Sequence, residues 1–473
     1  MRLLFQTPIV LMLAYYACAN ATYVVLTVVS LRANARQKFR RSTFKLDSVR
    51  RSPFIPFVSV IVPARNEQLS IVQSVRALLD LDYPELEIIV VNDGSSDTTL
   101  RCLQDSYDLR EARLLYVPEI ETAPVRGIYL SASEPKLIVI DKESGGSKAD
   151  ALNAGINAAN GAFVCIIDAD SILEKDALLR IMSAVYTDSA AVVAVGGIVR
   201  VLNGCTVDGG RVTSVHLPKK PMEVLQVVEY LRSFLIGREG WSTFDLLPLI
   251  SGAFGVFRTQ LVREVGGLNR GAIGEDLDLV IRMHRHLMDQ NRPYRIAFVP
   301  DPTCWTEVPS DWTSLSSQRV RWQRGLFQVL LQNRGMLFRP RYGWLGSVLL
   351  PYLWIFELLE PIIEVSGYVS MSVAVAMGIV GWHVLVFWVV IGLGPAVLIS
   401  MSAVVLEELT FRRYQSWSEV RRLLLYCVLE NFPYRQMHLY WRMKGLVQYF
   451  GKTPTWQDIR RKGLASMAAQ PTG

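Results

Sequence analysis

The spacing of hydrophobic and polar positions changes along the chain and predicts several kinds of segment. Residues 9–31 are almost uniformly apolar. A helix of this length crosses a hydrocarbon core of about 30 Å, so the pattern predicts a membrane span. Small residues at Ala17, Ala19 and Ala21 resemble a signal-peptide cleavage site, but apolar sequence continues past them. This continuation favours an uncleaved anchor.

Beyond the anchor, short Val/Ile-rich runs alternate with segments of helical spacing. The runs FVSVIVP and ELEIIVV have the length of strands, and apolar residues between them recur at helical intervals. Further runs, KLIVI, AFVCIID and AVVAVGGIV, extend the alternation to about residue 199. The pattern predicts an α/β domain with a mostly parallel sheet. Such sheets bind ligands at the carboxyl ends of their strands, where polar residues are candidates for chemistry.

A second apolar region spans residues 344–405 and is long enough for two long helices or three short ones. Its first part contains Glu357, Glu360 and Glu364. Carboxylates at membrane depth face protein or a water-filled path, so these residues either line a channel or have a structural role at an interface. Residues 423–450 are typical of an amphipathic interface helix or a weak additional span.

Basic residues orient the predicted spans. Only Arg2 precedes the first span, whereas many Lys and Arg residues follow it. The positive-inside rule therefore places the N-terminus outside and the following domain in the cytoplasm. Basic residues after residue 405 predict a cytoplasmic tail and an even number of C-terminal spans.

Composition agrees with a protein that is part soluble and part membrane. The chain has 473 residues, of which 51% are hydrophobic, and a net charge of +7. Much of the basic excess lies beside apolar tracts, so we expect an anionic lipid surface and no nucleic acid as its partner. The six cysteines form no C-x-x-C pair, which argues against a disulfide framework or a zinc knuckle.

Carboxylates follow several predicted strands. Asp93 lies in VNDGSSD, a pattern that also suits a helix cap. Asp168 and Asp170 are spaced i and i+2 at the end of another strand, so both can turn into the same crevice. Carboxylates bind Mg²⁺ or Mn²⁺ and leave coordination positions for phosphates and water.

The motifs PARNE, VNDGSSD, KADALN, DADS, GED and QRVRW occur in the order found in membrane-embedded family 2 glycosyltransferases. Over roughly residues 57–322 the chain resembles the synthases of cellulose, hyaluronan, chitin and poly-N-acetylglucosamine, and its layout is most similar to the last. The resemblance implies a GT-A-like nucleotide-sugar-binding domain with helical transmembrane and interfacial segments.

The resemblance also implies roles for individual residues. Asp93 is expected to contact the uracil end of a UDP-sugar, and Lys148 the diphosphate. Asp168 is expected to bind the nucleotide and, with Asp170, the metal. Asp276 in GEDLDL is expected to be the general base, although this chain has GED where several relatives have TED.

The Q-x-x-R-W motif supplies three further candidates. The resemblance places Gln318 and Trp322 in the acceptor site and Arg321 near the diphosphate. Arg321 and Trp322 also suit a membrane flank, but their position between the catalytic domain and the apolar region favours the functional interpretation. We expect Arg319 and Arg324 to be surface charges.

The chemistry of transfer is consistent with these roles. A divalent ion, Lys148 and Arg321 can neutralise the charge that accumulates on the leaving diphosphate. A carboxylate base contributes typically about 10² to 10⁴ in rate. The resemblance implies this role for Asp276 rather than for Glu275 or Asp278. Structural roles at a helix start are plausible for two of the three, because acidic residues favour the first turn.

Other polar and glycine-rich segments carry less information. His284 and His286 are two residues apart and do not form a metalloprotease pair, so solvated positions on a helix are expected. Gly196-Gly197, Asn203-Gly204 and Gly209-Gly210 are expected to lie in a turn-rich insertion, because no phosphate-loop pattern accompanies them.

We therefore predict inverting, metal-dependent transfer of a sugar from a UDP-sugar to a growing β-glycan, processive and coupled to export, with Mg²⁺ or Mn²⁺ as cofactor. Inversion rests chiefly on the resemblance. Transfer of one sugar to a lipid acceptor and a non-catalytic sugar-nucleotide-binding membrane subunit are the alternatives, and an accessory subunit or oligomer stays open. The expected location is the plasma or inner membrane. We predict four domains. Residues 1–53 form an anchor with a basic linker, and residues 54–342 form a cytosolic catalytic domain. Residues 343–406 form a transmembrane region, and residues 407–473 form a basic cytoplasmic interface helix and tail.

Overall fold

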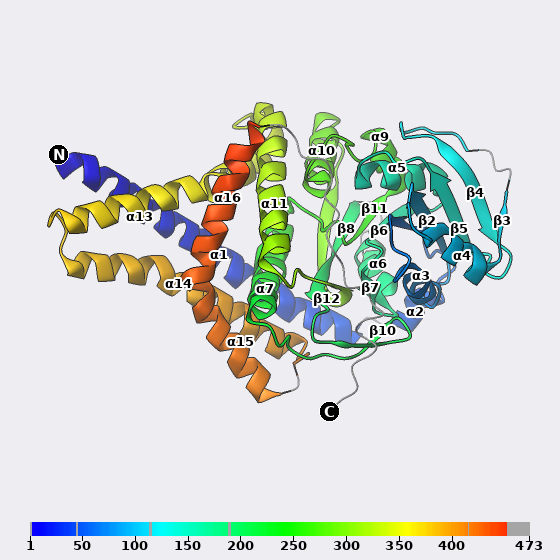
Figure 1. The fold of residues 1–473 in the computed structure, drawn as a ribbon, viewed down its shortest axis with the longest axis horizontal. Coiled ribbons are helices and arrows are strands. Elements are labelled where there is room, and N and C mark those ends of the chain that lie inside the picture. The colour runs from blue at the N-terminus through cyan, green and yellow to red at the C-terminus, as the bar shows by residue number, and fades with distance from the viewer. Residues whose placement is uncertain (1, 44–45, 113–115, 188–190, 415, 452–473) are drawn as a thin grey trace. The chain divides into compact units, whose positions relative to one another are not determined.

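A computed structural model describes residues 2–43, 46–112, 116–187, 191–414 and 416–451. The chain divides into two compact units whose segments interleave along the sequence (Figure 1). We call them the α/β unit, which includes Arg36–Lys219 and Leu247–Val308, and the helical unit, formed by Met1–Ala35, Lys220–Leu246 and Pro309–Thr453. Each unit is described by itself.

The α/β unit is built on a ten-stranded sheet with the order β3-β4-β5-β2-β1-β6-β11-β8-β12-β7. Its strands are β1 (Val58–Ala64), β2 (Leu86–Asp93), β3 (Leu109–Glu111), β4 (Val125–Ser131), β5 (Leu137–Lys142), β6 (Phe163–Ile167), β7 (Ile172–Leu173), β8 (Val192–Val201), β11 (Phe254–Arg258) and β12 (Arg295–Thr306). A separate hairpin pairs β9 (Thr206–Asp208) with β10 (Arg211–Ser214).

The predicted α/β fold class is confirmed, and the sheet is mixed. Strands β5, β2, β1 and β6 are parallel neighbours, as are β8 and β12. Strand β11 runs antiparallel to β6 on one side and to β8 on the other, and β4 runs antiparallel to β5. A periodic pattern identifies strands but not their direction, which is why the sequence indicated more parallel pairing.

Buried strands and their covering helices explain the apolar runs. Every residue of β2 and β8 is buried. Helix α5 (Lys148–Ala158) packs on β1 and β2, and α6 (Ala177–Thr187) packs on β8 and β12. A Cβ on Gly155 would come within 2.4 Å of Ile61, so glycine permits this close approach of α5 to the sheet. The other helices of the unit are α2 (Leu46–Arg50), α3 (Ile71–Leu79), α4 (Thr99–Tyr107), α9 (Thr259–Glu264) and α10 (Glu275–Asp289).

One glycine pair was assigned wrongly from the sequence. Gly196-Gly197 lies inside strand β8, not in a turn. A Cβ on Gly196 would lie 3.3 Å from Ile250, so a small residue suits the packing against this side chain. The pairs at Asn203-Gly204 and Gly209-Gly210 do lie in turns, as predicted.

The helical unit contains the apolar regions. Its elements are most of α1 (Arg2–Thr43), then α7 (Pro221–Leu231), η1 (Arg232–Arg238), α8 (Glu239–Thr243), α11 (Trp312–Gln332), η2 (Arg334–Met336), η3 (Pro340–Tyr342), η4 (Leu345–Leu349), α12 (Leu350–Tyr352), η5 (Leu353–Leu358), α13 (Glu360–Ala376), α14 (Trp382–Thr410), α15 (Trp417–Leu429), η6 (Glu430–Tyr434) and α16 (Arg435–Tyr449).

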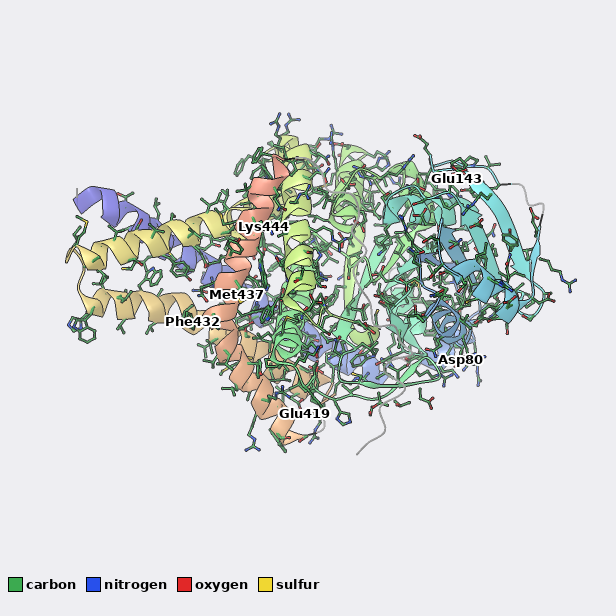
Figure 2. The ribbon with its side chains drawn as sticks, in the orientation of Figure 1. Asp80, Glu143, Glu419, Phe432, Met437 and Lys444 are labelled. Carbon is green, nitrogen blue, oxygen red and sulfur yellow. The ribbon has the colours of Figure 1, made fainter. Side chains whose placement is uncertain are left out.

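Within the described part of the chain, two helical segments are long and apolar enough to cross a membrane, namely Val10–Arg36 and Trp382–Thr410. Helix α13 has 17 residues, fewer than the roughly 20 that a span usually needs. In the described residues, Trp382–Thr410 is therefore the C-terminal segment that meets the length and composition of a span. The segment predicted at 423–450 is divided between α15 and α16, and the exposed side chain of Phe432 lies at the break (Figure 2).

The glutamates of the second apolar region form ion pairs. Glu364 pairs with Arg435 and Glu360 with Arg442, both from α16. Glu357 lies 3.8 Å from Arg442. These contacts give the carboxylates a structural role. Arg435 and Arg442 are among the basic residues after residue 405, and their guanidinium groups are largely covered by packed helices.

Candidate active site

Four of the predicted residues lie near the carboxyl ends of neighbouring strands in the α/β unit. Asp93 is the last residue of β2, and Asp168 directly follows β6. Lys148 is the first residue of α5, the helix after β5. Asp276 lies in the first turn of α10. The fold therefore gathers residues that are up to 183 positions apart in sequence, from Asp93 to Asp276.

Asp93 is buried and belongs to a charged cluster. Its carboxylate accepts hydrogen bonds from Lys142 Nζ at 2.8 Å and from the Gly145 backbone at 3.1 Å. Lys142 is fully buried and also pairs with Asp150. The helix-cap alternative for Asp93 does not hold, because the Thr99 backbone at the start of α4 donates to Asp97.

Lys142 was not singled out in the sequence, where it merely ends an apolar run. Its importance follows from the two buried carboxylates that it joins, Asp93 and Asp150, and only the fold brings these together. An uncompensated buried charge costs far more than a surface ion pair contributes.

We expect Lys142→Met to lower the free energy of unfolding by about 3–5 kcal/mol, because it leaves Asp93 buried without its cation, whereas Asp150 keeps Arg270 Nε at 3.0 Å. Chemical denaturation of the purified full chain measures this change. Lys175→Met is the matched control, since its ammonium is half exposed and lies 3.9 Å from Asp80. Equal effects of the two substitutions would contradict a buried role for Lys142.

Lys148 supplies a positive charge beside several carboxylates. Its Nζ donates to the Gly252 carbonyl at 2.9 Å and pairs with Asp168. Burial alone would lower the pKa of this ammonium, but the carboxylates of Asp168, Glu275 and Asp276 outweigh burial and raise the pKa above its ordinary value. Lys148 therefore stays protonated at neutral pH and can attract a diphosphate.

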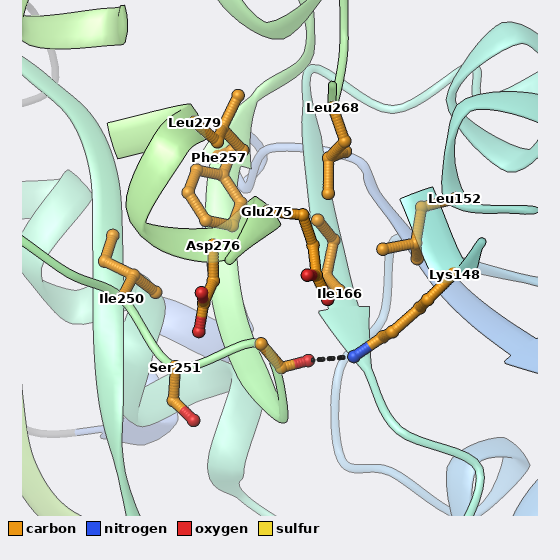
Figure 3. Close-up of a pocket in the computed structure, with 11 residues that line it drawn as sticks. Lys148, Leu152, Ile166, Ile250, Ser251, Phe257, Leu268, Glu275, Asp276 and Leu279 are labelled. Atoms are coloured by element: carbon orange, nitrogen blue, oxygen red, sulfur yellow. Dashed lines mark hydrogen bonds between the residues drawn. The ribbon is translucent and has the colours of Figure 1, made fainter. Parts of the chain in front are cut away.

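A small pocket brings this lysine together with two carboxylates of α10. Figure 3 shows Lys148, Glu275 and Asp276 directed toward the same space, with the Ser251-Gly252 backbone at its border. A Cβ on Gly252 would lie 3.4 Å from Lys148 Nζ and 3.7 Å from Asp276 Oδ2, so glycine keeps this position open. The apolar part of the lining comes from Leu152, Ile166, Ile250, Phe257, Leu268 and Leu279.

The three acidic residues of α10 have different surroundings. Asp278 is buried and accepts a hydrogen bond from Arg282 Nε at 2.7 Å, and Arg282 also donates to the carbonyls of Val265 and Gly267. Asp278 is thus part of the packing. Glu275 and Asp276 are the two that line the pocket.

Asp168 and Asp170 form a pair of hard oxygen donors after β6. In the residues that the structure describes, no group of three or more His, Cys, Asp or Glu side chains is arranged to hold a metal. Two carboxylates still suit Mg²⁺ or Mn²⁺, because these ions take further oxygens from phosphates and water. Burial and the nearby Asp168 carboxylate raise the pKa of the Cys304 thiol well above its usual value, so this neighbour stays protonated.

The Q-x-x-R-W residues lie on α11 in the helical unit. Arg321 is exposed, and Trp322 has 45% of its surface exposed. Gln318 is partly buried, and its side-chain oxygen is covered without a hydrogen-bond donor in the described ranges. A covered side-chain oxygen without a donor can accept a hydrogen bond from a ligand hydroxyl.

The expectation that Arg319 and Arg324 are surface charges was wrong. Arg319 is 3% exposed and pairs with Glu229, and Arg324 is 5% exposed. Helix α11 packs against α16, which covers a face that the sequence alone does not identify as buried. The QRVRWQRG segment therefore has both a buried charged face and an exposed one.

The expectation for His284 was also wrong. This side chain is fully buried, and its ring nitrogens contact the Tyr294 hydroxyl at 2.7 Å and the Leu247 carbonyl at 3.0 Å. Burial lowers its pKa to about 4, so the imidazole is neutral at physiological pH. His286 is partly exposed and lies 3.3 Å from Glu264, close to what was expected.

Two family models match the chain. Residues 59–208 match the model described as glycosyl transferase family 2, and residues 163–402 match the one described as glycosyl transferase family group 2. The second match covers about half of the chain and includes the D-x-D pair, Asp276 and the Q-x-x-R-W motif.

Similar curated proteins include one named "Probable glycosyltransferase YdaM" from Bacillus subtilis, which is 29% identical over 290 residues, 60% of this chain and 59% of that protein. Poly-beta-1,6-N-acetyl-D-glucosamine synthases from Staphylococcus epidermidis and Staphylococcus aureus are each 27% identical, over 58% and 64% of this chain and 56% and 63% of their own lengths. The chain thus spans less than two thirds of the length of these relatives.

Solved structures that the comparison finds include a mannosyltransferase, PcManGT, from Pyrobaculum calidifontis in complex with GDP-Man and Mn²⁺. It has a TM-score of 0.48 and 19% identity, and the comparison covers 88% of this chain and 99% of that one. TarS 1–349 from S. aureus in complex with UDP-GlcNAc has a TM-score of 0.37 and 15% identity, with 83% and 91% covered.

The family matches agree with the predicted GT-A-like α/β fold, whose nucleotide-binding candidates lie where the strands of the mixed sheet end. Because the longer match takes in half of the sequence and contains both the sheet-end carboxylates and the α11 motif, this chain belongs to the glycosyl transferase family group 2.

Proposed function

We propose that this protein transfers a sugar from a UDP-sugar to a growing β-glycan with inversion, adds successive sugars, and exports the polymer across the membrane. The observation that carries the proposal is the pocket that combines the Lys148 cation with the carboxylates of Glu275 and Asp276. Similarity to poly-beta-1,6-N-acetyl-D-glucosamine synthases supports N-acetylglucosamine as the transferred sugar.

In the proposed reaction the acceptor hydroxyl oxygen forms a bond to the anomeric carbon, while the bond from that carbon to the diphosphate breaks. The hydroxyl proton passes to Asp276, and the electron pair of the broken bond leaves with UDP. Lys148 and Arg321 stabilise the negative charge on the leaving diphosphate. Asp93 recognises the uracil end, and Gln318 and Trp322 hold the acceptor.

Asp168 and Asp170 are the residues proposed to hold a divalent cation, Mg²⁺ or Mn²⁺. When bound, the ion supplies positive charge that neutralises the donor phosphates. Lys148 already pairs with Asp168, so the ammonium is positioned next to the proposed phosphate site before a donor arrives.

The proposed location is the plasma or inner membrane, with the catalytic domain in the cytoplasm. The apolar helical segments Val10–Arg36 and Trp382–Thr410 support this proposal. On α14 the exposed apolar side chains suit contact with lipid; they include Val384, Val386, Phe387, Val390, Leu398, Val405 and Leu409. We retain the functional division into residues 1–53, 54–342, 343–406 and 407–473.

The test is incubation of membranes containing the full chain with a panel of UDP-sugars, followed by sizing of the product. We expect UDP-N-acetylglucosamine to give a long polymer. If the product were a lipid that carries one sugar, the single-transfer alternative would hold and the proposed polymerisation would be wrong. Binding of UDP-sugars without turnover would overturn the proposed enzymatic activity.

The same preparation tests the metal. We expect chelation to stop transfer and Asp170→Ala to remove the increase in UDP affinity that Mg²⁺ or Mn²⁺ produces in the parent, as measured by calorimetric titration with and without metal. Asp105→Ala is the matched control, because this carboxylate is 74% exposed on α4 and pairs only loosely with Arg101 at 3.8 Å. Transfer that continued at the parent rate in chelator would exclude the assignment.

A further inference from the structure

The buried face of α11 places an arginine directly against the motif tryptophan. Arg319 and Trp322 are three residues apart, so their side chains lie on neighbouring positions of one helix face. The guanidinium carbon of Arg319 lies 4.3 Å from the centroid of the Trp322 ring. This distance is within the roughly 6 Å at which a cation over an indole face is attracted.

The guanidinium is also contacted by residues of two other elements. Arg319 Nη2 donates to Glu229 of α7 at 2.8 Å, and the Tyr434 hydroxyl in η6 donates to the same carboxylate oxygen at 3.3 Å. In the described ranges, Nε and Nη1 of Arg319 are covered and have no hydrogen-bond acceptor. The indole is therefore a favourable partner for this charge in addition to Glu229 and Tyr434.

The backbone beside the tryptophan is fixed as well. Gln323 is buried, donates to the Leu358 carbonyl at 3.1 Å and accepts from Arg442 Nε at 2.8 Å. A Cβ on Gly445 of α16 would lie 3.0 Å from Gln323 Cβ, so the two helices approach closely at this point. Gln323 thus fixes the helix at its neighbour Trp322.

We propose that Arg319 is a positioning residue for the acceptor site: held by Glu229, it supports one side of the Trp322 indole, so that the exposed part of the ring is held ready to stack on the acceptor sugar. This rests on the proposed acceptor role of Trp322. A ring without this support would retain its exposure but sample other rotamers. The predicted loss is therefore in acceptor binding and not in donor binding.

The test uses the purified full chain, UDP-N-acetylglucosamine and β-linked N-acetylglucosamine oligomers as acceptors. We expect Arg319→Met to raise the acceptor KM about tenfold, the size of effect that a desolvated cation–π contact supports. The donor KM and the slow hydrolysis of donor without acceptor should stay within about twofold. Arg319→Lys should recover only part of the loss, because an ammonium keeps the charge but not the planar contact.

Arg319→Met leaves the partly buried Glu229 without its partner and can reduce folding. The double variant Arg319→Met/Glu229→Gln removes both charges and should restore the thermal unfolding midpoint. A positioning role predicts that its acceptor KM stays raised, whereas a purely structural role predicts that the acceptor KM recovers with stability. Recovery would overturn the proposal.

Two further controls separate the possible failures. Arg101→Met replaces an arginine that is 80% exposed on α4 and should change none of these quantities. If the parent protein transfers no sugar from the UDP-sugar panel, the proposed function fails before any variant is compared. If the parent is active and Arg319→Met has a normal acceptor KM, only the positioning role of Arg319 fails.

Discussion

Replacing Asp276 by asparagine should leave UDP binding close to that of the parent while turnover falls by at least about 10². Asparagine keeps the size of the side chain but cannot accept the acceptor proton. Asp276 lines the pocket with Lys148, and its Oδ1 accepts a hydrogen bond from the Leu277 backbone at 2.9 Å, a contact that the amide oxygen of asparagine can retain. Titration with UDP and measurement of product release separate binding from chemistry.

Two further variants on α10 test whether the loss of turnover is specific to Asp276. Asp289→Asn changes a carboxylate at the far end of the same helix and should be almost neutral. Glu275→Gln tests the other carboxylate of the pocket. A large loss of turnover in Glu275→Gln with near-normal turnover in Asp276→Asn would transfer the role of base to Glu275. Parallel loss of UDP binding and turnover in Asp276→Asn would indicate a structural carboxylate.

Trp322→Ala should retain UDP binding and slow donor hydrolysis but lose chain extension by about 10². Water needs no stacking surface, whereas an acceptor sugar displaced by about 1 Å can lose that factor in rate. Product sizing and UDP release, measured with and without acceptor, provide the two rates. Trp322→Phe should keep part of the extension activity because it retains an aromatic face.

The control for membrane anchoring is Trp312→Ala at the start of the same helix. Trp312 is 47% exposed, close to the exposure of Trp322, and its ring lies 6.2 Å from that of Trp441. A tryptophan that serves only as an interfacial anchor affects insertion or stability. If Trp322→Ala still produced full-length polymer, or if both alanine variants lost only expression, Trp322 would not be an acceptor residue.

The sequence predicted the parts of the molecule that depend on local pattern. Apolar runs of strand length identified β1, β2, β5, β6 and β8, and the polar residues that end them led to Asp93, Asp168 and Asp170. The direction of β11 was not predictable, because pairing with β6 and β8 depends on strands that lie about 60 to 90 positions earlier in the chain.

Ion pairs between residues far apart in the chain could not be predicted from the sequence either. Arg319 meets Glu229 across 90 positions, and Lys142 meets Asp93 across 49. Nothing in the local spacing distinguishes these charges from solvated ones. These charges are buried because helices or strands pack over them. Once buried, each charge needs its partner for the fold to be stable.

The interleaving of the two units has a consequence for how the protein can be produced. Residues 220–246 belong to the helical unit, yet the chain enters and leaves them between strands β10 and β11 of the α/β unit. Helix α7 within them packs on α14 and α15, which are synthesised more than 150 residues later. A shortened gene ending near residue 342 would therefore yield a chain in which α7, whose buried residues include Val224, Val227, Val228 and Leu231, lacks its packing partners α14 and α15. Soluble expression of the catalytic region calls for redesign of α7, and not only for removal of the apolar ends.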